Sequence, residues 1–361
     1  MHTGTQSGLL KYFPTPKFLT MPAVGIEVTP EAVRFIEFLE TRKGIAVGRY
    51  GSYPVPKEVA SAEDFLASEE LKKILSDIKT KHKLSLVHAA VPEDKTYIFR
   101  TEVPHLAARE IRESLELKLE ENVPLPPREA VFDYKVIPGE QGDRLNVSVS
   151  VIPHLVVSRY LDLFTSVGLA PISFQVSAQT MVQALVPRED VTPLIVVNFG
   201  KEKTGLYLVS DRLVHFTSQM AAGGSALTEA IKKTFSITDS EAEQMKMEKG
   251  ITRRKEDSEL FFSLANTLSA LKEEVEKVSM YWDTHLDRYS GVKQKIGRVI
   301  LCGSESGIPG LPEYLEASLS VPVVLGNVWT NLFSFDSYIP PLSQKESLAY
   351  GSVIGLSPLL W

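Results

Sequence analysis

Glycines beside polar residues mark two places where this chain could hold a phosphate group. Gly200 and Lys201 follow an apolar run, and Gly223, Gly224 and Ser225 precede an amphipathic helical pattern. Glycine lets a ligand approach the backbone, and the N–H groups of a turn or a helix N-terminus attract anions. The pattern predicts an anion site with free backbone N–H groups, and a helix capped by the serine. The alternative is an ordinary β-meander followed by a capped helix.

The elements that must position these turns are short strands rich in β-branched residues. Residues 194–199, 205–209 and 213–216 alternate with turn-forming residues, which is typical of an antiparallel meander. Residues 23–39 form a similar hairpin pattern around a turn at 29–31. Two units that each open with a hairpin indicate an internal duplication. Two such halves facing each other would bring both hairpin tips to a shared cleft.

The composition limits the classes of function. The 361 residues are 43% hydrophobic and 23% charged, as expected for a globular protein with more than one compact unit. The formal net charge of −6 argues against a nucleic-acid partner. The single cysteine, Cys302, excludes an intrachain disulfide and is predicted to be a buried core residue. No apolar run reaches the roughly 20 residues that span a bilayer, so we expect a cytoplasmic protein.

The chain divides into four predicted regions. Residues 1–21 lack a signal pattern and are expected to be a disordered extension. Residues 22–96 predict a first lobe of three antiparallel strands, a helix and a strand. Residues 97–176 predict an inserted β-α-β-β-α-β subdomain, and residues 177–361 predict the second lobe. The predicted fold class is therefore α/β, with two duplicated lobes around a central cleft and one insert.

Several segments together resemble one superfamily, although none is specific alone. Residues 24–28 and 196–200 are similar to the two phosphate hairpins of the actin-like ATPases, whose core is a duplicated ribonuclease H-like fold. Residues 302–311 resemble the adenosine motif of that superfamily. More narrowly, the chain from about 24 to 356 resembles the PilM family of type IV pilus assembly proteins, which are related to the cell-division protein FtsA. The narrower resemblance is carried by residues 116–134, 168–171, 223–231, 241–246 and 348–351.

The resemblance implies a nucleotide in the cleft, which would be ATP or ADP with Mg²⁺. It assigns nine cofactor-binding residues. Those at the phosphates would be Gly200, Lys201, Gly223, Gly224 and Ser225. Glu243 and Lys246 would lie along the ribose and adenine, and Gly303 and Ser304 beneath the adenosine. Glutamate and lysine at i, i+3 place an acceptor and a cation on one helix face. The alternative for that pair is an ordinary exposed ion pair.

The residues that would support hydrolysis depart from the family pattern. Thr29 replaces a glycine of the first hairpin, Asn198 replaces an aspartate of the second, and Gln175 stands where an acid is expected. Hydrolysis needs Mg²⁺ held by carboxylates and a residue that positions water. Of those acids only Glu27 remains, and it would be the catalytic candidate if the protein were active. We therefore expect a degenerate cleft without hydrolysis or a metal site, in which nucleotide binding is weak or absent.

The resemblance also implies a scaffold role at the cytoplasmic face of the inner membrane. The partner would be a PilN-like bitopic membrane protein, whose cytoplasmic N-terminal segment would lie in a groove between the first lobe and the insert. We predict Leu115, Leu119, Val123 and Leu125 as an apolar wall of that groove. The alternative, of equal weight, is that they pack the core of the insert. An assembly ATPase and a platform protein are further candidate partners, and a ring or other homo-oligomer stays open.

Three other functions compete with the scaffold. The first is an active, ATP-hydrolysing actin-like protein of the pilus or cell-division machinery. The second is an FtsA-like divisome protein, which would carry a basic amphipathic membrane helix, whereas residues 355–361 are short, apolar and interrupted by Pro358. The third is a GspL-like secretion component, which would continue into a membrane span. The sequence features described above favour the scaffold over each of these three functions.

Overall fold

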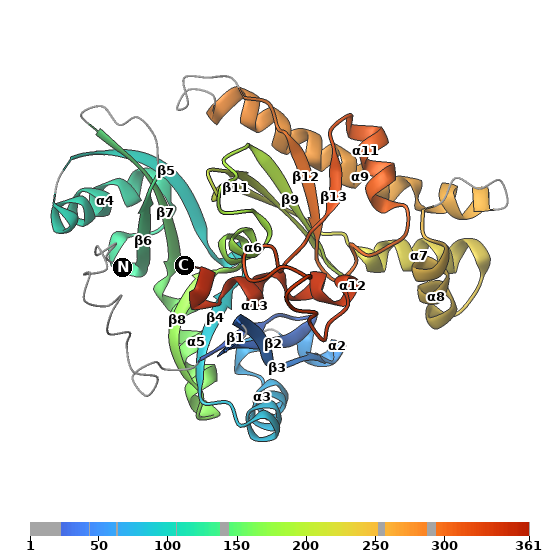
Figure 1. Cartoon of the computed structure of the whole chain (residues 1–361), viewed down its shortest axis with the longest axis horizontal. Coiled ribbons are helices and arrows are strands. Elements are labelled where there is room, and N and C mark those ends of the chain that lie inside the picture. Colours follow the sequence, from blue (N-terminus) through green and yellow to red (C-terminus); the bar gives the residue numbers. More distant parts are fainter. Residues whose placement is uncertain are drawn as a thin grey trace.

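The computed structural model describes residues 23–360, apart from 43, 63, 106, 138–143, 252–256 and 287–293. The predicted extension, residues 1–21, lies outside the described residues. Figure 1 shows two sheets on either side of a central pair of helices, with a smaller sheet beside them. Among the described residues, no helix combines the length and apolarity that a membrane span requires.

The first lobe is built on a five-stranded sheet in the order β3-β2-β1-β4-β8. Its strands are β1 (Val24–Val28), β2 (Ala32–Thr41), β3 (Gly44–Pro54), β4 (Leu86–Val91) and β8 (Ala170–Val176). β1 is antiparallel to β2 and parallel to β4, and β4 is parallel to β8. The sheet is accompanied by α2 (Lys57–Ala60), α3 (Glu69–His82), α5 (His154–Ser166) and the short helices η1 (Phe65–Ala67) and η2 (Glu93–Lys95).

Helix α3 illustrates how local sequence sets these elements. Its leucine and isoleucine positions recur at helical spacing, and Leu71, Leu75 and Ile78 are buried in the core of the first lobe. The Ser68 side chain accepts a hydrogen bond from the Leu71 N–H at the start, and Lys83 adopts a left-handed conformation at the end. These caps satisfy backbone groups that have no partner within the helix.

The second lobe repeats the same sheet in the order β11-β10-β9-β12-β13, which confirms the predicted duplication. Its strands are β9 (Leu194–Phe199), β10 (Thr204–Ser210), β11 (Leu213–Met220), β12 (Arg298–Cys302) and β13 (Val323–Leu325). β9 is antiparallel to β10 and parallel to β12, as β1 is to β2 and β4. The accompanying helices are α7 (Gly224–Phe235), α8 (Asp239–Lys249), α9 (Ser258–Tyr281), the π-helical turn η5 (Trp282–Leu286) and α11 (Leu311–Leu319).

The predicted insert of residues 97–176 divides between two parts of the fold. Its first elements form a three-stranded sheet, β5-β7-β6, with one helix; they are β5 (Tyr97–Pro104), α4 (Ala108–Asn122), η3 (Pro127–Glu129), β6 (Ala130–Val136) and β7 (Arg144–Pro153). Its last elements return to the first lobe, because β8 pairs with β4 and α5 buries Tyr160, Leu163 and Phe164 in that lobe's core. The separate sheet therefore ends at Pro153.

Two helices join the lobes, α6 (Ser177–Leu185) and α13 (Gly351–Gly355). They cross at the centre of the molecule (Figure 1), and a Cβ atom added at Gly355 would lie only 1.7 Å from the Thr180 carbonyl oxygen. The closing segment is divided into α12 (Gln344–Ser347), η6 (Leu348–Tyr350) and α13, with η7 (Pro358–Leu360) after them. Glycine at the crossing allows the two backbones to touch.

We predict that Gly355→Ala destabilises the protein by about 3 kcal/mol or more, because the added methyl group must push α13 away from α6. The control is Gly307→Ala, whose Cβ would meet only the flexible Lys345 side chain, at 3.4 Å, and should change stability by less than about 0.5 kcal/mol. Chemical denaturation of both variants measures the difference. Equal stability of the two variants would contradict the close crossing.

Candidate functional site

The hairpin turns of the two lobes meet in the cleft, as the duplication predicted. The Lys201 N–H of the second lobe lies 3.5 Å from Glu31 Oε2 of the first. The Tyr207 hydroxyl donates to Glu93 Oε1 at 2.8 Å, and Lys203 Nζ lies 3.4 Å from Asp94 Oδ2. These three contacts join the first lobe directly to β10 and its turn. The described cleft is therefore closed by side chains and backbone of the protein itself.

The backbone N–H groups predicted to be free for an anion have partners within the protein. The Gly200 N–H donates to the Lys203 carbonyl oxygen at 3.1 Å, the Gly224 N–H to Gly200 O at 3.0 Å, and the Ser225 N–H to Lys201 O at 2.8 Å. The β9–β10 turn therefore rests on the first turn of α7. This contact corrects the expectation of free N–H groups, because the turn carbonyls take the donors.

Gly223, and not Ser225 as predicted, is the N-cap residue of α7, and both residues have further contacts within the protein. A Cβ atom added at Gly223 would lie 2.3 Å from the Gly200 carbonyl oxygen, so glycine is needed there for the turn to pack. Gly223 is also the N-cap residue of α7, and Ser225 lies inside the helix. The Ser225 hydroxyl donates to Glu202 Oε1 at 2.7 Å instead of capping the helix. Gly223 thus allows the β9–β10 turn to pack closely on the start of α7.

Glu31 lies between the two hairpin turns, although the sequence did not single it out as a site residue. Its Oε1 atom forms an ion pair with Arg34 Nη2 at 2.6 Å, while Oε2 faces the Lys201 N–H. Burial opposes ionisation of this carboxyl, but the Arg34 charge, the neighbouring Ser304 hydroxyl and the Lys201 N–H together lower the pKa of Glu31. A carboxylate therefore sits against the second phosphate turn.

The first hairpin turn offers little to a phosphate. The Thr29 N–H donates to the Ala32 carbonyl oxygen at 3.1 Å, and the Thr29 hydroxyl both donates to Ala32 O and accepts from Ala32 N. Pro30 has no N–H. The turn therefore satisfies its own hydrogen bonds, as expected for threonine in a tight turn.

Glu243 and Lys246 come together, as the i, i+3 spacing predicted, but they do not form an exposed pair. The Lys246 side chain is completely buried, and its Nζ atom lies 2.9 Å from Glu243 Oε2 and 2.7 Å from Glu305 Oε2. It also donates to Thr228 Oγ1 at 3.0 Å and to the Gly224 carbonyl oxygen at 3.3 Å. One ammonium group thus joins α7, α8 and the loop after β12.

The carboxyl groups around Lys246 differ in their environment. Burial raises the pKa of Glu305, although the Lys246 charge opposes this shift. Burial also opposes ionisation of Glu243, but hydrogen bonds from Lys246 and Thr228 prevail and lower the pKa of Glu243. The like charges of Glu243 and Glu31 add to the effect of burial on Glu305, whereas the Lys246 and Lys201 charges add to the hydrogen bonds that favour ionised Glu243.

Gly303 and Ser304 form the turn that leads to Glu305. Gly303 has a φ of +101°, and a Cβ atom there would lie 2.5 Å from the Phe199 carbonyl oxygen. The turn directs Glu305 onto the helix start, since a Cβ atom added at Gly224 would lie 2.2 Å from Glu305 Oε2. The sequence analysis did not identify Glu305 as a site residue. The feature that could have indicated it is its position two residues after the turn glycine, Gly303.

Three further polar side chains of the cleft, those of Glu27, Asn198 and Glu93, have neutral hydrogen-bond partners. Glu27 Oε1 accepts hydrogen bonds from the hydroxyls of Ser177, at 2.9 Å, and Ser352, at 2.5 Å. Asn198 Nδ2 donates to the Tyr207 hydroxyl at 3.1 Å. Burial raises the pKa of Glu93, which accepts from the same hydroxyl. In the part of the chain that the structure describes, no group of three or more acids, histidines or cysteines has the geometry to hold a metal ion.

The leucines predicted as a partner wall lie inside the insert. Leu115, Leu119 and Val123 are buried against the strands of the β5-β7-β6 sheet, and Leu125 packs on the edge of the same cluster. The expectation that they line an exposed groove is therefore corrected. The alternative, that these side chains pack the core of the insert, describes the structure, because α4 has a single apolar face and the sheet covers it.

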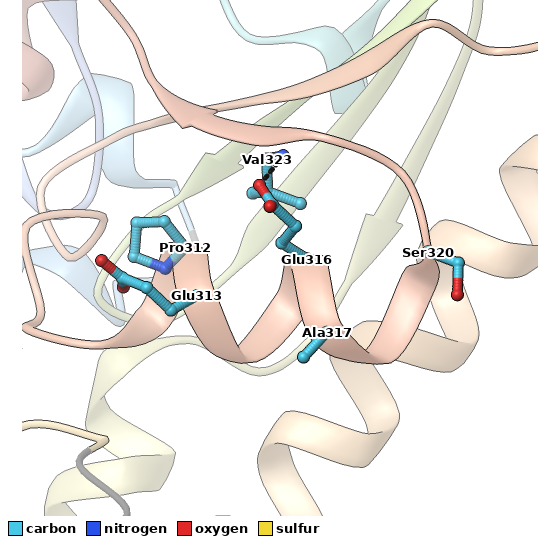
Figure 2. Close-up of a pocket in the computed structure, with 6 residues that line it drawn as sticks. All are labelled: Pro312, Glu313, Glu316, Ala317, Ser320 and Val323. Atoms are coloured by element: carbon cyan, nitrogen blue, oxygen red, sulfur yellow. Dashed lines mark hydrogen bonds between the residues drawn. The ribbon is translucent and has the colours of Figure 1, made fainter.

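Two further features carry no chemistry of their own. A surface hollow of about 500 Å³ lies along α11, as Figure 2 shows, and is lined by Pro312, Glu313, Glu316, Ala317, Ser320 and Val323. None of the predicted site residues lines it, and Glu316 Oε2 accepts a hydrogen bond from the Val323 N–H at 3.0 Å. Cys302 is buried on β12, and burial raises the pKa of its thiol to about 12, which fits the predicted core role.

The two equivalent sheets, the hairpins that meet between them and the helices that cross beneath them define a protein of the actin-like ATPase fold. A family model described as "Type IV pilus assembly protein PilM" matches residues 25–357. The chain therefore belongs to the PilM family of type IV pilus assembly proteins.

Solved structures agree with this fold. The chain is similar to one from the "PilM-PilN type IV pilus biogenesis complex", with a TM-score of 0.73 and 19% identity, over 93% of this chain and 97% of that one. It is also similar to the ethanolamine utilization protein EutJ from Carboxydothermus hydrogenoformans (TM-score 0.53, 15% identity, 95% and 90% covered). MreB5 of Spiroplasma citri bound to ADP is similar as well (TM-score 0.53, 12% identity, 92% and 95% covered).

We predict that Glu31→Gln lowers the free energy of unfolding by about 1–2 kcal/mol at pH 7, because Arg34 loses its charged partner. The pKa of Glu31 is lowered in the folded state, so its contribution is present above the ordinary glutamate pKa and is lost as the pH falls through the folded value. The difference between wild type and variant should therefore shrink below about pH 4. Urea denaturation at several pH values measures it.

The control for this experiment is Glu40→Gln, which removes an exposed carboxylate from β2, the strand that follows Glu31. It should alter stability by less than about 0.5 kcal/mol. A Glu31 variant whose deficit stays constant from pH 7 to pH 3 would show that the ion pair does not stabilise the turn.

Proposed function

We propose that this protein is a non-catalytic cytoplasmic scaffold of the type IV pilus inner-membrane platform, or of a related competence or secretion machine. In this role it binds the cytoplasmic N-terminal segment of a PilN-like membrane protein. Membership of the PilM family and the likeness to a chain of the PilM–PilN complex support the partner. The observation that carries the non-catalytic part is the engagement of Asn198 and Glu27 with hydroxyl groups. These hydrogen bonds support the proposal, because metal-assisted hydrolysis needs carboxylates that are available to a metal ion or its water ligands.

The junction between the first lobe and the insert supports a location for the partner segment. Helix α5 leaves β7 directly at Pro153, and Arg159 on that helix forms an ion pair with Asp64 of the first lobe at 3.6 Å. Leu155, in the first turn of α5, is 62% exposed. Val131 on β6 is 41% exposed and pairs in register with Ile152, close to the start of the helix. Exposed apolar side chains at one junction are typical of a binding surface.

Leu155→Glu should weaken binding of a peptide copied from the PilN-like cytoplasmic segment by about tenfold or more. The reason is that the peptide would cover this side chain, and a glutamate there would lose its contact with water on binding. Fluorescence anisotropy with a labelled peptide measures the dissociation constant. The matched control is Leu117→Glu, since Leu117 is 78% exposed on α4. If both variants lose affinity equally, or if neither loses affinity, the peptide does not bind at this junction.

Hydrolysis is tested separately by phosphate release from ATP with Mg²⁺. The wild type and Glu27→Ala should give the same background rate, because no residue of the cleft is expected to activate water. Turnover by the wild type that Glu27→Ala abolishes would refute the scaffold proposal and support an active ATPase, with Glu27 as the metal-binding acid. Folding of the variant is checked by circular dichroism before the rates are compared.

A further inference from the structure

We infer that two of the protein's own carboxylates, Glu31 and Glu305, occupy the cleft as built-in ligands, so that the lobes close without a nucleotide. This inference rests on the proposed non-catalytic function and deepens it, since it assigns the cleft a structural role. The family implies a nucleotide between the lobes, and the described residues do not fit one in this arrangement. Glu31 belongs to the first lobe and Glu305 to the second, and the two carboxylates have different partners.

Glu305 fills the side of the cleft where the resemblance would place the nucleoside. Its Oε2 atom touches the helix start at Gly224 and lies 2.7 Å from Lys246 Nζ. The Lys246 ammonium has three hydrogen atoms to donate, and four oxygen atoms lie within 3.3 Å of it. Lys246 therefore has no donor left for a ribose or a phosphate. A ligand at this place must first displace Glu305 from a buried ion pair.

Glu31 fills the side where the phosphates would lie. It comes from the first lobe, and its Oε2 atom lies 3.5 Å from the Lys201 backbone nitrogen of the second lobe. A carboxylate oxygen accepts hydrogen bonds much as a phosphate oxygen does. Because Arg34 holds the other oxygen at 2.6 Å, Glu31 is fixed in this position by its own lobe. It therefore links the lobes as an anionic ligand would.

The charges that surround this region oppose the entry of a further anion. Glu27, Glu93 and Asp94 belong to the first lobe, and Glu243 lies beside Lys246. The cations nearby are already paired: Lys203 with Asp94, Arg34 with Glu31, and Lys246 with two glutamates. The Lys201 charge acts on Glu243. A polyphosphate would enter close to several carboxylates, and bringing like charges together in a closed site is costly.

A closed cleft also has a consequence for the partner surface. Strand β5 of the insert lies beside β11, the edge strand of the second lobe. The lobe contacts at Glu31, Glu93 and Asp94 therefore help to set the position of the insert relative to the second lobe. With built-in ligands, this arrangement does not depend on the nucleotide concentration, which suits a permanent scaffold.

Hydrogen exchange of the purified full chain, read by mass spectrometry, tests the inference. The segments to follow are 200–204 in the β9–β10 turn and 223–228 at the start of α7. Both should be protected in the wild type without nucleotide, and millimolar ATP with Mg²⁺ should leave them unchanged. Glu31→Gln should accelerate exchange in the turn, and Glu305→Gln should accelerate it at the helix start, each by about tenfold.

The matched control is Glu313→Gln, which neutralises an exposed acid on α11 and should change neither segment. If Glu305→Gln folds poorly, Lys246→Met removes the same ion pair while keeping an unbranched buried side chain, and exchange at the helix start should rise in the same way. Either of two results would overturn the inference: wild-type segments that exchange quickly and become protected only with ATP, or glutamine variants that match the control.

The peptide-binding assay separates this inference from the proposed function. If ATP is needed to protect the cleft while the wild type still binds the PilN-like peptide, the built-in ligands are refuted and the scaffold stands. If protection without ATP is observed and no peptide binds at the junction, the inference stands and the proposed partner site fails.

Discussion

The buried ammonium group of Lys246 is the interaction on which the chemistry of the cleft depends. A charged group removed from water is costly unless every donor finds an acceptor. Here the acceptors come from three places in the chain: Thr228 and Gly224 on α7, Glu243 on α8, and Glu305 after β12. Their convergence draws the loop after β12 onto the start of α7. The same convergence occupies all the donors of the Lys246 ammonium group.

The two lobes share one sheet topology but use their hairpins differently. In the first lobe the turn residues Thr29 and Pro30 satisfy or remove their own donors, and the next residue, Glu31, reaches across the cleft. In the second lobe the turn at Gly200 packs on α7 and receives that carboxylate. The duplication therefore supplies a symmetrical frame, whose two hairpin tips contact each other through Glu31 and Lys201.

The insert keeps its own apolar core covered. Its helix α4 buries Leu115 and Leu119 against the β5-β7-β6 sheet, so the apolar face of α4 is used within the insert. The exposed apolar side chains, such as Leu155, lie instead where the chain returns to the first lobe. A binding surface at such a junction depends on the relative position of two units. In the proposed function, contacts between the lobes would therefore bear on partner binding, although they lie elsewhere in the molecule.

The sequence alone determined the hairpins, the duplication, the helix after Gly223 and the pairing of Glu243 with Lys246, because each is recorded in residues close together in the chain. Only the tertiary structure decided that β8 joins the first lobe, that Leu115 faces inward, and that Glu305 and Glu31 occupy the cleft. Glu305 meets Lys246 across 59 positions, and Glu31 meets Lys201 across 170. The periodicity of neighbouring residues does not indicate contacts between residues so far apart in the chain. They depend on the packing of whole lobes, where burial sets which charged groups must pair.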